Sequence, residues 1–144
     1  MGQFETYLLL FTDVLTSNFA FNISSELVLD TMQIFGNYNK HLMLLVATAA
    51  YMFSICINYI FGTICYKILA PSNQKAPELN SKIEYIRNSR FLLVIIAVSC
   101  LPFFGKFIIL FSGFCQINFK KTLITSLFAK LIYYIIVIFS SCII

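Results

Sequence analysis

The hydrophobic positions of the chain form four long stretches, and one hydrophilic segment, 70–90, divides them into two pairs. The second stretch carries no charge from Leu42 until Lys67. As a helix this uncharged run is about 37 Å long, more than the ~30 Å thickness of the hydrocarbon core. It predicts a transmembrane helix over 42–69. The last stretch, 122–144, carries no charge except Lys130 near its beginning and predicts a second transmembrane helix.

The third stretch, 91–117, is interrupted at its centre by Pro102, Gly105 and Lys106. Each arm on either side would be about 16 Å long as a helix, close to half of the hydrocarbon core. Proline removes a backbone donor and glycine permits a reversal of the chain. Two interpretations follow: a kinked helix that crosses the membrane, or a re-entrant hairpin that enters and leaves on one side.

The distribution of basic residues favours the hairpin. The positive-inside rule places segment 70–90 in the cytoplasm. If 91–117 forms a hairpin, Lys120 and Lys121 return to that side, which then holds seven basic residues, and Lys40 alone stays outside. If 91–117 crosses the membrane, both lysines are exported. The hairpin therefore agrees better with the rule.

The first stretch, 4–35, is interrupted in the same way and contains no Lys or Arg. Asn22, Ser24 and Ser25 are turn residues, and Glu26 suits the positive end of a following helix. The predicted fold is an all-α integral membrane protein of a single domain, 1–144. It has two oppositely inserted re-entrant helical hairpins, each followed by a transmembrane helix. Inverted repeats with broken helices are typical of transporters, which bind substrate near the middle of the membrane.

Composition supports a membrane protein and excludes several other classes. The chain is 60% hydrophobic and 11% charged, whereas soluble domains carry about 25% charged residues. Its net charge is +4, but the basic residues form no face that is interleaved with aromatic residues. Nucleic acid is therefore not an expected partner. The five cysteines include no CxxC pair, and His41 is the single histidine. We expect no metal, no cofactor and no enzymatic activity.

Three charged residues, Glu26, Asp30 and Lys106, are expected at membrane depth. An unpaired charge there costs at least ~2.5–3.5 kcal/mol, so each needs a partner, water or a function. If the hairpin tips meet, Lys106 lies opposite Glu26 and Asp30, where it could exchange a carboxylate for a lipid phosphate as the carboxylate takes a proton. The alternative is an ion pair that only locks the hairpins together.

Two further polar residues are expected to serve packing. Asn58 lies within the predicted helix 42–69, where its amide can form a hydrogen bond to another helix. Lys130 is expected to extend its side chain back toward the headgroups, as lysines near helix ends do. Neither residue is a predicted ligand.

Several short segments resemble the DedA family (SNARE-associated, or VTT-domain, membrane proteins), and in particular its short bacterial YqaA-like branch. In the second half these are residues 101–106 (LPFFGK), Gly113 and 129–134 (AKLIYY); in the first half they are 24–29 (SSELVL) and 57–62 (INYIFG). The resemblance implies two opposed re-entrant hairpins, with Glu26 as the acidic residue of the first.

It also implies that Pro102 and Gly105 form the tip of the second hairpin. Tyr133 departs from the pattern, since the short branch carries arginine there. The bulky residues 51–53 also depart, because small residues that allow close helix approach are usual at those positions.

The expected function is a lipid transporter or scramblase-like protein that moves phosphate-bearing lipids across the bilayer. The composition, rich in Lys, Ile, Phe and Asn, is typical of AT-rich coding and points to a bacterial inner membrane. The sequence leaves open whether protons drive transport and whether a homodimer is the working unit. The rival expectations are a structural or assembly subunit of the membrane and, third, an ion-conducting pore.

Overall fold

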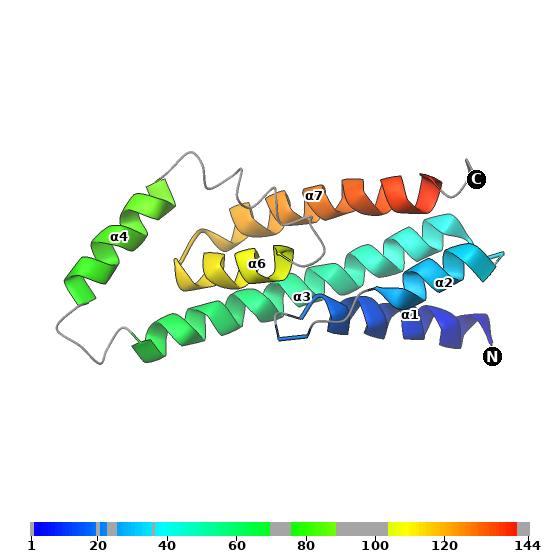
Figure 1. Cartoon of the computed structure of the whole chain (residues 1–144), viewed down its shortest axis with the longest axis horizontal. Coiled ribbons are helices and arrows are strands. Elements are labelled where there is room, and N and C mark those ends of the chain that lie inside the picture. Colours follow the sequence, from blue (N-terminus) through cyan, green and yellow to red (C-terminus); the bar gives the residue numbers. More distant parts are fainter. Residues whose placement is uncertain are drawn as a thin grey trace.

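The computed structural model describes residues 2–19, 21–22, 26–35, 37–69, 76–88 and 104–140. These residues are entirely helical apart from short connections, as predicted. The helices are α1 (Gln3–Ser17), α2 (Leu27–Phe35), α3 (Lys40–Leu69), α4 (Ala76–Asn88), α6 (Gly105–Phe114) and α7 (Phe119–Ser140). Figure 1 shows α3 running along most of the molecule, with the hairpin of α1 and α2 beside one half of it and α6 beside the other.

Helices α3 and α7 are both long and apolar enough to cross a membrane. They match the two predicted helices, although α3 begins two residues earlier and α7 three residues earlier than expected. Only 33% of the most apolar part of α3 and 28% of that of α7 are buried within the protein. A core helix of a soluble protein would be mostly buried, so the outward apolar faces of these helices are typical of membrane association.

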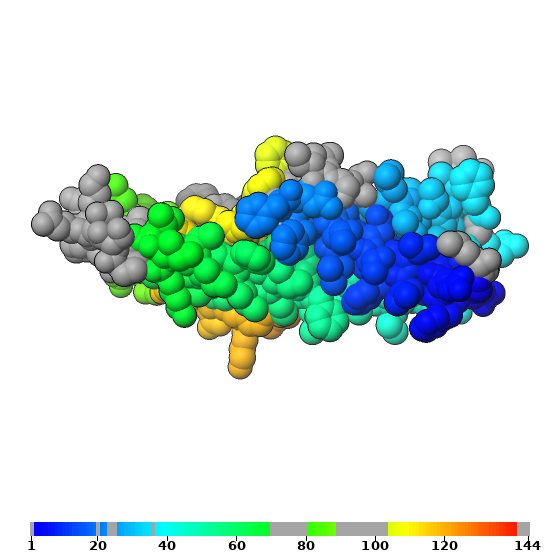
Figure 2. All heavy atoms as spheres, turned by 90° about the horizontal axis from the view of Figure 1, so that it is seen from below, coloured from blue at the N-terminus to red at the C-terminus, as the bar shows by residue number. Residues whose placement is uncertain are grey.

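The α1–α2 hairpin extends to the middle of α3 and turns back there. Near the start of α1, the Tyr7 hydroxyl accepts a hydrogen bond of 3.2 Å from the backbone N–H of Asn39, just before α3. Beyond the end of α1, the carbonyl of Asn18 accepts hydrogen bonds from Ser54 and Asn58, halfway along α3. Figure 2 shows α1 covering one half of α3 and leaving the other half uncovered on this face.

The two arms of this hairpin are fastened by a carboxylate. Oδ2 of Asp13 in α1 accepts a hydrogen bond of 2.9 Å from the backbone N–H of Val28, in the first turn of α2. The first N–H groups of a helix have no partner within the helix, and a carboxylate is the strongest acceptor for them. Asp13 thus acts as an N-terminal cap supplied from a neighbouring helix.

We expect Asp13→Ala to lower the free energy of unfolding in detergent by about 1 kcal/mol, the usual cost of removing such a cap. Thermal unfolding followed by circular dichroism measures the effect. Glu84→Ala is the matched control, because Glu84 is an exposed carboxylate on α4. An Asp13→Ala protein that melts together with Glu84→Ala would show that this hydrogen bond contributes nothing.

Helices α3 and α6 touch through glycine. A Cβ atom on Gly62 would lie 2.1 Å from the carbonyl oxygen of Leu110, and one on Gly113 would lie 2.3 Å from that of Tyr59. Such distances mean that the two backbones are in direct contact, as in the small-residue packing of membrane helices. The bulky residues at 51–53 lie at least six residues before this contact, which involves Tyr59 and Gly62 of α3, and none of them is among the atoms nearest to it.

Beyond α6 the chain reverses through Gln116, which has a φ of 52°. Helix α7 then returns antiparallel to α3, so that Phe139 near its end packs against His41 at the start of α3 (ring centroids 6.4 Å apart). Of the predicted second hairpin, 91–117, only residues from 104 onward lie in the described part, and Pro102 lies outside it. Ser24 and Ser25 of the first hairpin lie outside it as well.

Helix α4 falls within the hydrophilic segment 70–90. Its Ile83 is buried against Cys115 and Ile117 of the α6–α7 turn. This packing brings the exposed basic residues of α4 to the same end of the molecule as those at the end of α3 and the start of α7. They are Lys67, Lys82, Arg87, Lys120 and Lys121.

Candidate functional site

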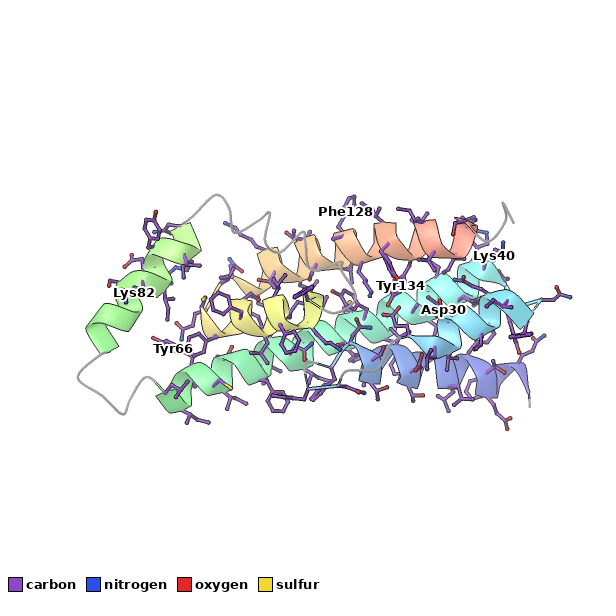
Figure 3. The ribbon with its side chains drawn as sticks, in the orientation of Figure 1. Asp30, Lys40, Tyr66, Lys82, Phe128 and Tyr134 are labelled. Atoms are coloured by element: carbon purple, nitrogen blue, oxygen red, sulfur yellow. The ribbon has the colours of Figure 1, made fainter. Side chains whose placement is uncertain are left out.

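Charged side chains meet at the tip of the first hairpin, halfway along α3. The end of α1, the residues before α2, the first turn of α6 and the middle of α7 all reach this point. We call the side chains of Glu26, Lys106 and Lys130, with the backbone around them, the tip cluster. Figure 3 shows the side chain of Tyr134 turned toward the interior from α7, whereas that of Phe128 points away from it.

Glu26 forms an ion pair with Lys130. Its Oε1 atom lies 3.0 Å from the Lys130 ammonium nitrogen. The same oxygen accepts hydrogen bonds from the Asn18 amide at 2.6 Å and from the Tyr134 hydroxyl at 3.0 Å. The side chain of Lys130 is 3% exposed and that of Glu26 is 14% exposed. Such a pair gives strong electrostatic attraction, because little water screens it.

Lys106 is held by backbone carbonyls and forms no ion pair with a carboxylate of the described residues. Its ammonium group donates hydrogen bonds to the backbone carbonyls of Ser17, at 3.0 Å, and Asn22. The residue is 5% exposed, and no carboxylate of the described residues lies within ion-pair distance of it. The tip cluster therefore holds two buried ammonium groups and one carboxylate.

The expected pairing of Lys106 with Glu26 and Asp30 is wrong. The first hairpin and the start of α6 do meet, as the sequence suggested, but Glu26 is bound by Lys130 instead. Asp30 is exposed on α2, and no hydrogen bond or ion pair joins it to Lys106 in the described residues. The reason is local: Leu29 and Met32 form the buried face of α2, so Asp30 lies on its exposed face.

The remaining predicted residues in the described part also take defined positions. Asn22 contributes its carbonyl to Lys106. Gly105 is buried as the first residue of α6. The amide of Asn58 donates to the Asn18 carbonyl at 2.8 Å, which is a contact between helices of the kind expected. None of these groups carries a charge, so the charge of the tip cluster comes from Glu26, Lys106 and Lys130.

Lys130 was expected to extend toward the headgroups, and the structure corrects this. The side chain turns inward because it belongs to the buried face of α7. Every fourth residue of that face is polar and buried; the set is Thr122, Ser126, Lys130 and Tyr134. A polar stripe on an otherwise apolar helix indicates the face that avoids lipid, so this spacing is the signal that identifies Lys130 as an interior residue.

In the described part of the chain, no three His, Cys, Asp or Glu side chains are placed to share a metal ion. The chemistry available to the tip cluster is therefore the binding of ions and polar groups through two ammonium groups, one carboxylate and several amide and hydroxyl groups.

Comparisons with known proteins give a clear relative. No family model matches the chain, and no solved structure matches it. The chain is 36% identical over 137 residues to the uncharacterized protein RP436 of Rickettsia prowazekii (strain Madrid E). The match covers 93% of this chain and 95% of the relative, so the two proteins correspond over nearly their whole lengths.

Proposed function

This chain belongs to the same family as the uncharacterized protein RP436 of Rickettsia prowazekii, and we propose a function for it from the tip cluster itself. The protein is an integral membrane lipid transporter or scramblase-like protein of a bacterial inner membrane. It moves phosphate-bearing lipids across the bilayer, and their headgroups bind at the tip cluster.

The dimensions of the helices support a membrane-embedded arrangement with re-entrant segments. Helix α3, with 30 residues, is about 45 Å long, whereas α6, with 10, is about 15 Å long. In the proposed arrangement α3 and α7 cross the bilayer, and the α1–α2 hairpin and α6 each reach its middle from opposite sides. The resemblance to the DedA family supports the same arrangement. The tip cluster then lies near the membrane midplane, where transporters bind their substrates.

The observation that carries the proposal is the excess of buried positive charge. Lys106 and Lys130 are both removed from water, and Glu26 balances only one of them. A buried ammonium held by neutral carbonyls attracts an anion more strongly than it would in water, because the surroundings screen the charge less. A headgroup phosphate is an anion that a bilayer supplies, and lysine binds phosphate well as a point charge.

We expect Lys106→Met to slow lipid transport at least about tenfold, because a hydrogen bond to a charged group contributes ~1.5–3 kcal/mol. The measurement uses proteoliposomes with a fluorescent phospholipid that is quenched from outside by an impermeant reductant. Lys120→Met is the control, since Lys120 is an exposed lysine at the start of α7. A folded Lys106→Met protein that transports at the wild-type rate would remove Lys106 from the proposed site.

One observation favours a second candidate, a structural subunit that transports nothing. The Glu26 oxygen that faces Lys130 already has three partners, and such satisfied pairs can serve only to fix the packing of a fold. This candidate predicts that the wild-type protein moves no lipid in proteoliposomes and co-purifies with a larger membrane complex.

The proposed topology makes a separate prediction. Residues 88 and 121 are exposed, and the packing of α4 on the α6–α7 turn places both at the basic end of the molecule. In a cysteine-free background, Asn88→Cys and Lys121→Cys should react with an impermeant maleimide only from the cytoplasmic side. Gln3→Cys should react only from the opposite side. Labelling of positions 88 and 121 from different sides would exclude a re-entrant second segment.

A further inference from the structure

Three tyrosine rings surround the ammonium group of Lys130. Its nitrogen lies 5.4 Å from the ring centroid of Tyr51, 4.8 Å from that of Tyr133 and 5.2 Å from that of Tyr134. All three distances fall within the ~6 Å range of cation–π attraction. Tyr51 comes from α3 and the other two from α7. Together with Glu26, they form what we call the tyrosine cage.

The tyrosine cage has the chemistry of a site for ammonium ligands. Proteins bind organic ammonium groups by surrounding them with aromatic faces, which attract the cation through the ring quadrupole. A carboxylate adds a direct ion pair, here at 3.0 Å. The cation in this structure is part of the protein, carried on the flexible four-carbon stem of a lysine. A stem of that kind can withdraw without any movement of the helix that bears it.

We propose that the tyrosine cage is a binding site for the ammonium group of an amine-bearing phospholipid headgroup, and that Lys130 occupies this site in the present structure as a tethered substitute. The inference rests on the proposed function for its identification of the tip cluster as the headgroup site. It adds the class of lipid: a zwitterionic headgroup with an amine as well as a phosphate.

Charge balance shows why both halves of such a headgroup fit. At present Glu26 is paired with Lys130, and within the described residues Lys106 has no carboxylate at ion-pair distance. When the ammonium of a headgroup takes the place of Lys130, Glu26 keeps a cationic partner. The displaced Lys130 and the nearby Lys106 then both require an anion, and the phosphate of the same headgroup is one. The exchange adds one ion pair to the site. The net charge of the site stays the same, because the headgroup carries one positive and one negative charge.

The exposure of the pair fits entry of a headgroup from the Glu26 side. The Glu26 side chain is 14% exposed and that of Lys130 is 3% exposed, so an incoming ammonium meets the carboxylate before it meets the lysine. A pair that served only as a permanent lock would be indifferent to added amines. This difference can be measured without any transport.

The first test empties the cage and refills it with a small amine. In purified Lys130→Ala protein, methylammonium chloride should restore part of the lost melting temperature, and sodium chloride at the same concentration should not. The double variants Lys130→Ala/Tyr51→Leu and Lys130→Ala/Glu26→Gln should show no restoration by either salt. Equal effects of the two salts, or restoration that persists in both double variants, would overturn the proposal.

The second test uses the cage with Lys130 in place, in case Lys130→Ala does not fold. Protein in micelles with equal amounts of phosphatidylethanolamine and phosphatidylglycerol is analysed by native mass spectrometry for retained lipid. We expect preference for phosphatidylethanolamine, reduced roughly fivefold in Tyr133→Leu by loss of one cation–π contact. Tyr85→Leu is the control, because Tyr85 is 81% exposed on α4. No preference in the wild-type protein, or an unchanged one in Tyr133→Leu, would overturn the proposal.

These outcomes are separable from those of the transport assay. A protein that moves lipids but shows neither amine restoration nor headgroup preference keeps the proposed function and loses the ammonium site. A protein with both binding properties that moves no lipid loses the proposed function and keeps the site.

Discussion

Glu26→Gln is expected to lower the free energy of unfolding by about 3–5 kcal/mol, the cost of leaving one member of a buried ion pair without its partner. Glutamine can still accept hydrogen bonds from Asn18 and Tyr134, so the loss comes mainly from Lys130. That ammonium is almost wholly removed from water and would have no carboxylate. Chemical unfolding in detergent micelles measures the change. Circular dichroism follows the loss of helix, because the chain has no Trp whose fluorescence could report unfolding.

The control for this prediction is a second substitution that removes the stranded charge. Glu26→Gln/Lys130→Met should recover much of the stability lost by Glu26→Gln alone, because replacing both members of a buried pair is often neutral. If the double variant is as unstable as the single one, the defect lies in the packing around Glu26 and the ion pair is not its cause.

The contact between α3 and α6 leads to the second large effect. In Gly62→Ala the new methyl group would meet the carbonyl oxygen of Leu110 at 2.1 Å and the backbone nitrogen of Phe114 at 2.8 Å. Backbone atoms cannot rotate away, so the two helices must separate along this contact. We expect a loss of at least about 1–3 kcal/mol, the usual cost of overpacking, measured as a fall in melting temperature.

Gly2→Ala is a control without a steric clash, since a Cβ atom at this N-cap position before α1 meets nothing within 4 Å, whereas Gly62 lies inside α3. Away from such contacts, alanine is better than glycine inside a helix by about 1 kcal/mol. If Gly62→Ala lowers the melting temperature, the free-energy cost of the clash with α6 exceeds the helix-propensity gain of alanine. Equal or greater stability than that of Gly2→Ala would mean that the helices lie further apart than the structure has them.

The helices that the sequence predicted best are those with the strongest local signal. The uncharged run before Lys67 can only be a long apolar helix, and α3 follows it closely. Glu26 and Lys106 were also recognisable, because a charge within an apolar stretch is costly wherever the chain places it. These inferences need only the composition of one segment at a time.

The partners of these charges could not be read from single segments. Whether Glu26 meets Lys106 or Lys130 depends on how α7 is rotated and how far α6 reaches, which are properties of the packed molecule. The four-residue spacing from Thr122 to Tyr134 predicts which face of α7 points inward, but only if the polar side chains are assumed to avoid lipid. The contact of Gly62 with α6 likewise joins distant segments, and neither Gly62 nor Gly113 predicts it from its own sequence neighbourhood.

The hydrogen bonds of Lys106 have a consequence for how the protein is made. The carbonyls of Ser17 and Asn22 precede Lys106 by 89 and 84 residues, and the hydroxyl that binds Glu26 is 108 residues further on than its carboxylate. A ribosome releases the first half of the chain well before these partners exist. The first hairpin therefore completes these contacts only after the second half of the chain has been made, and a chain truncated before Lys106 should be degraded because those polar groups keep no partner.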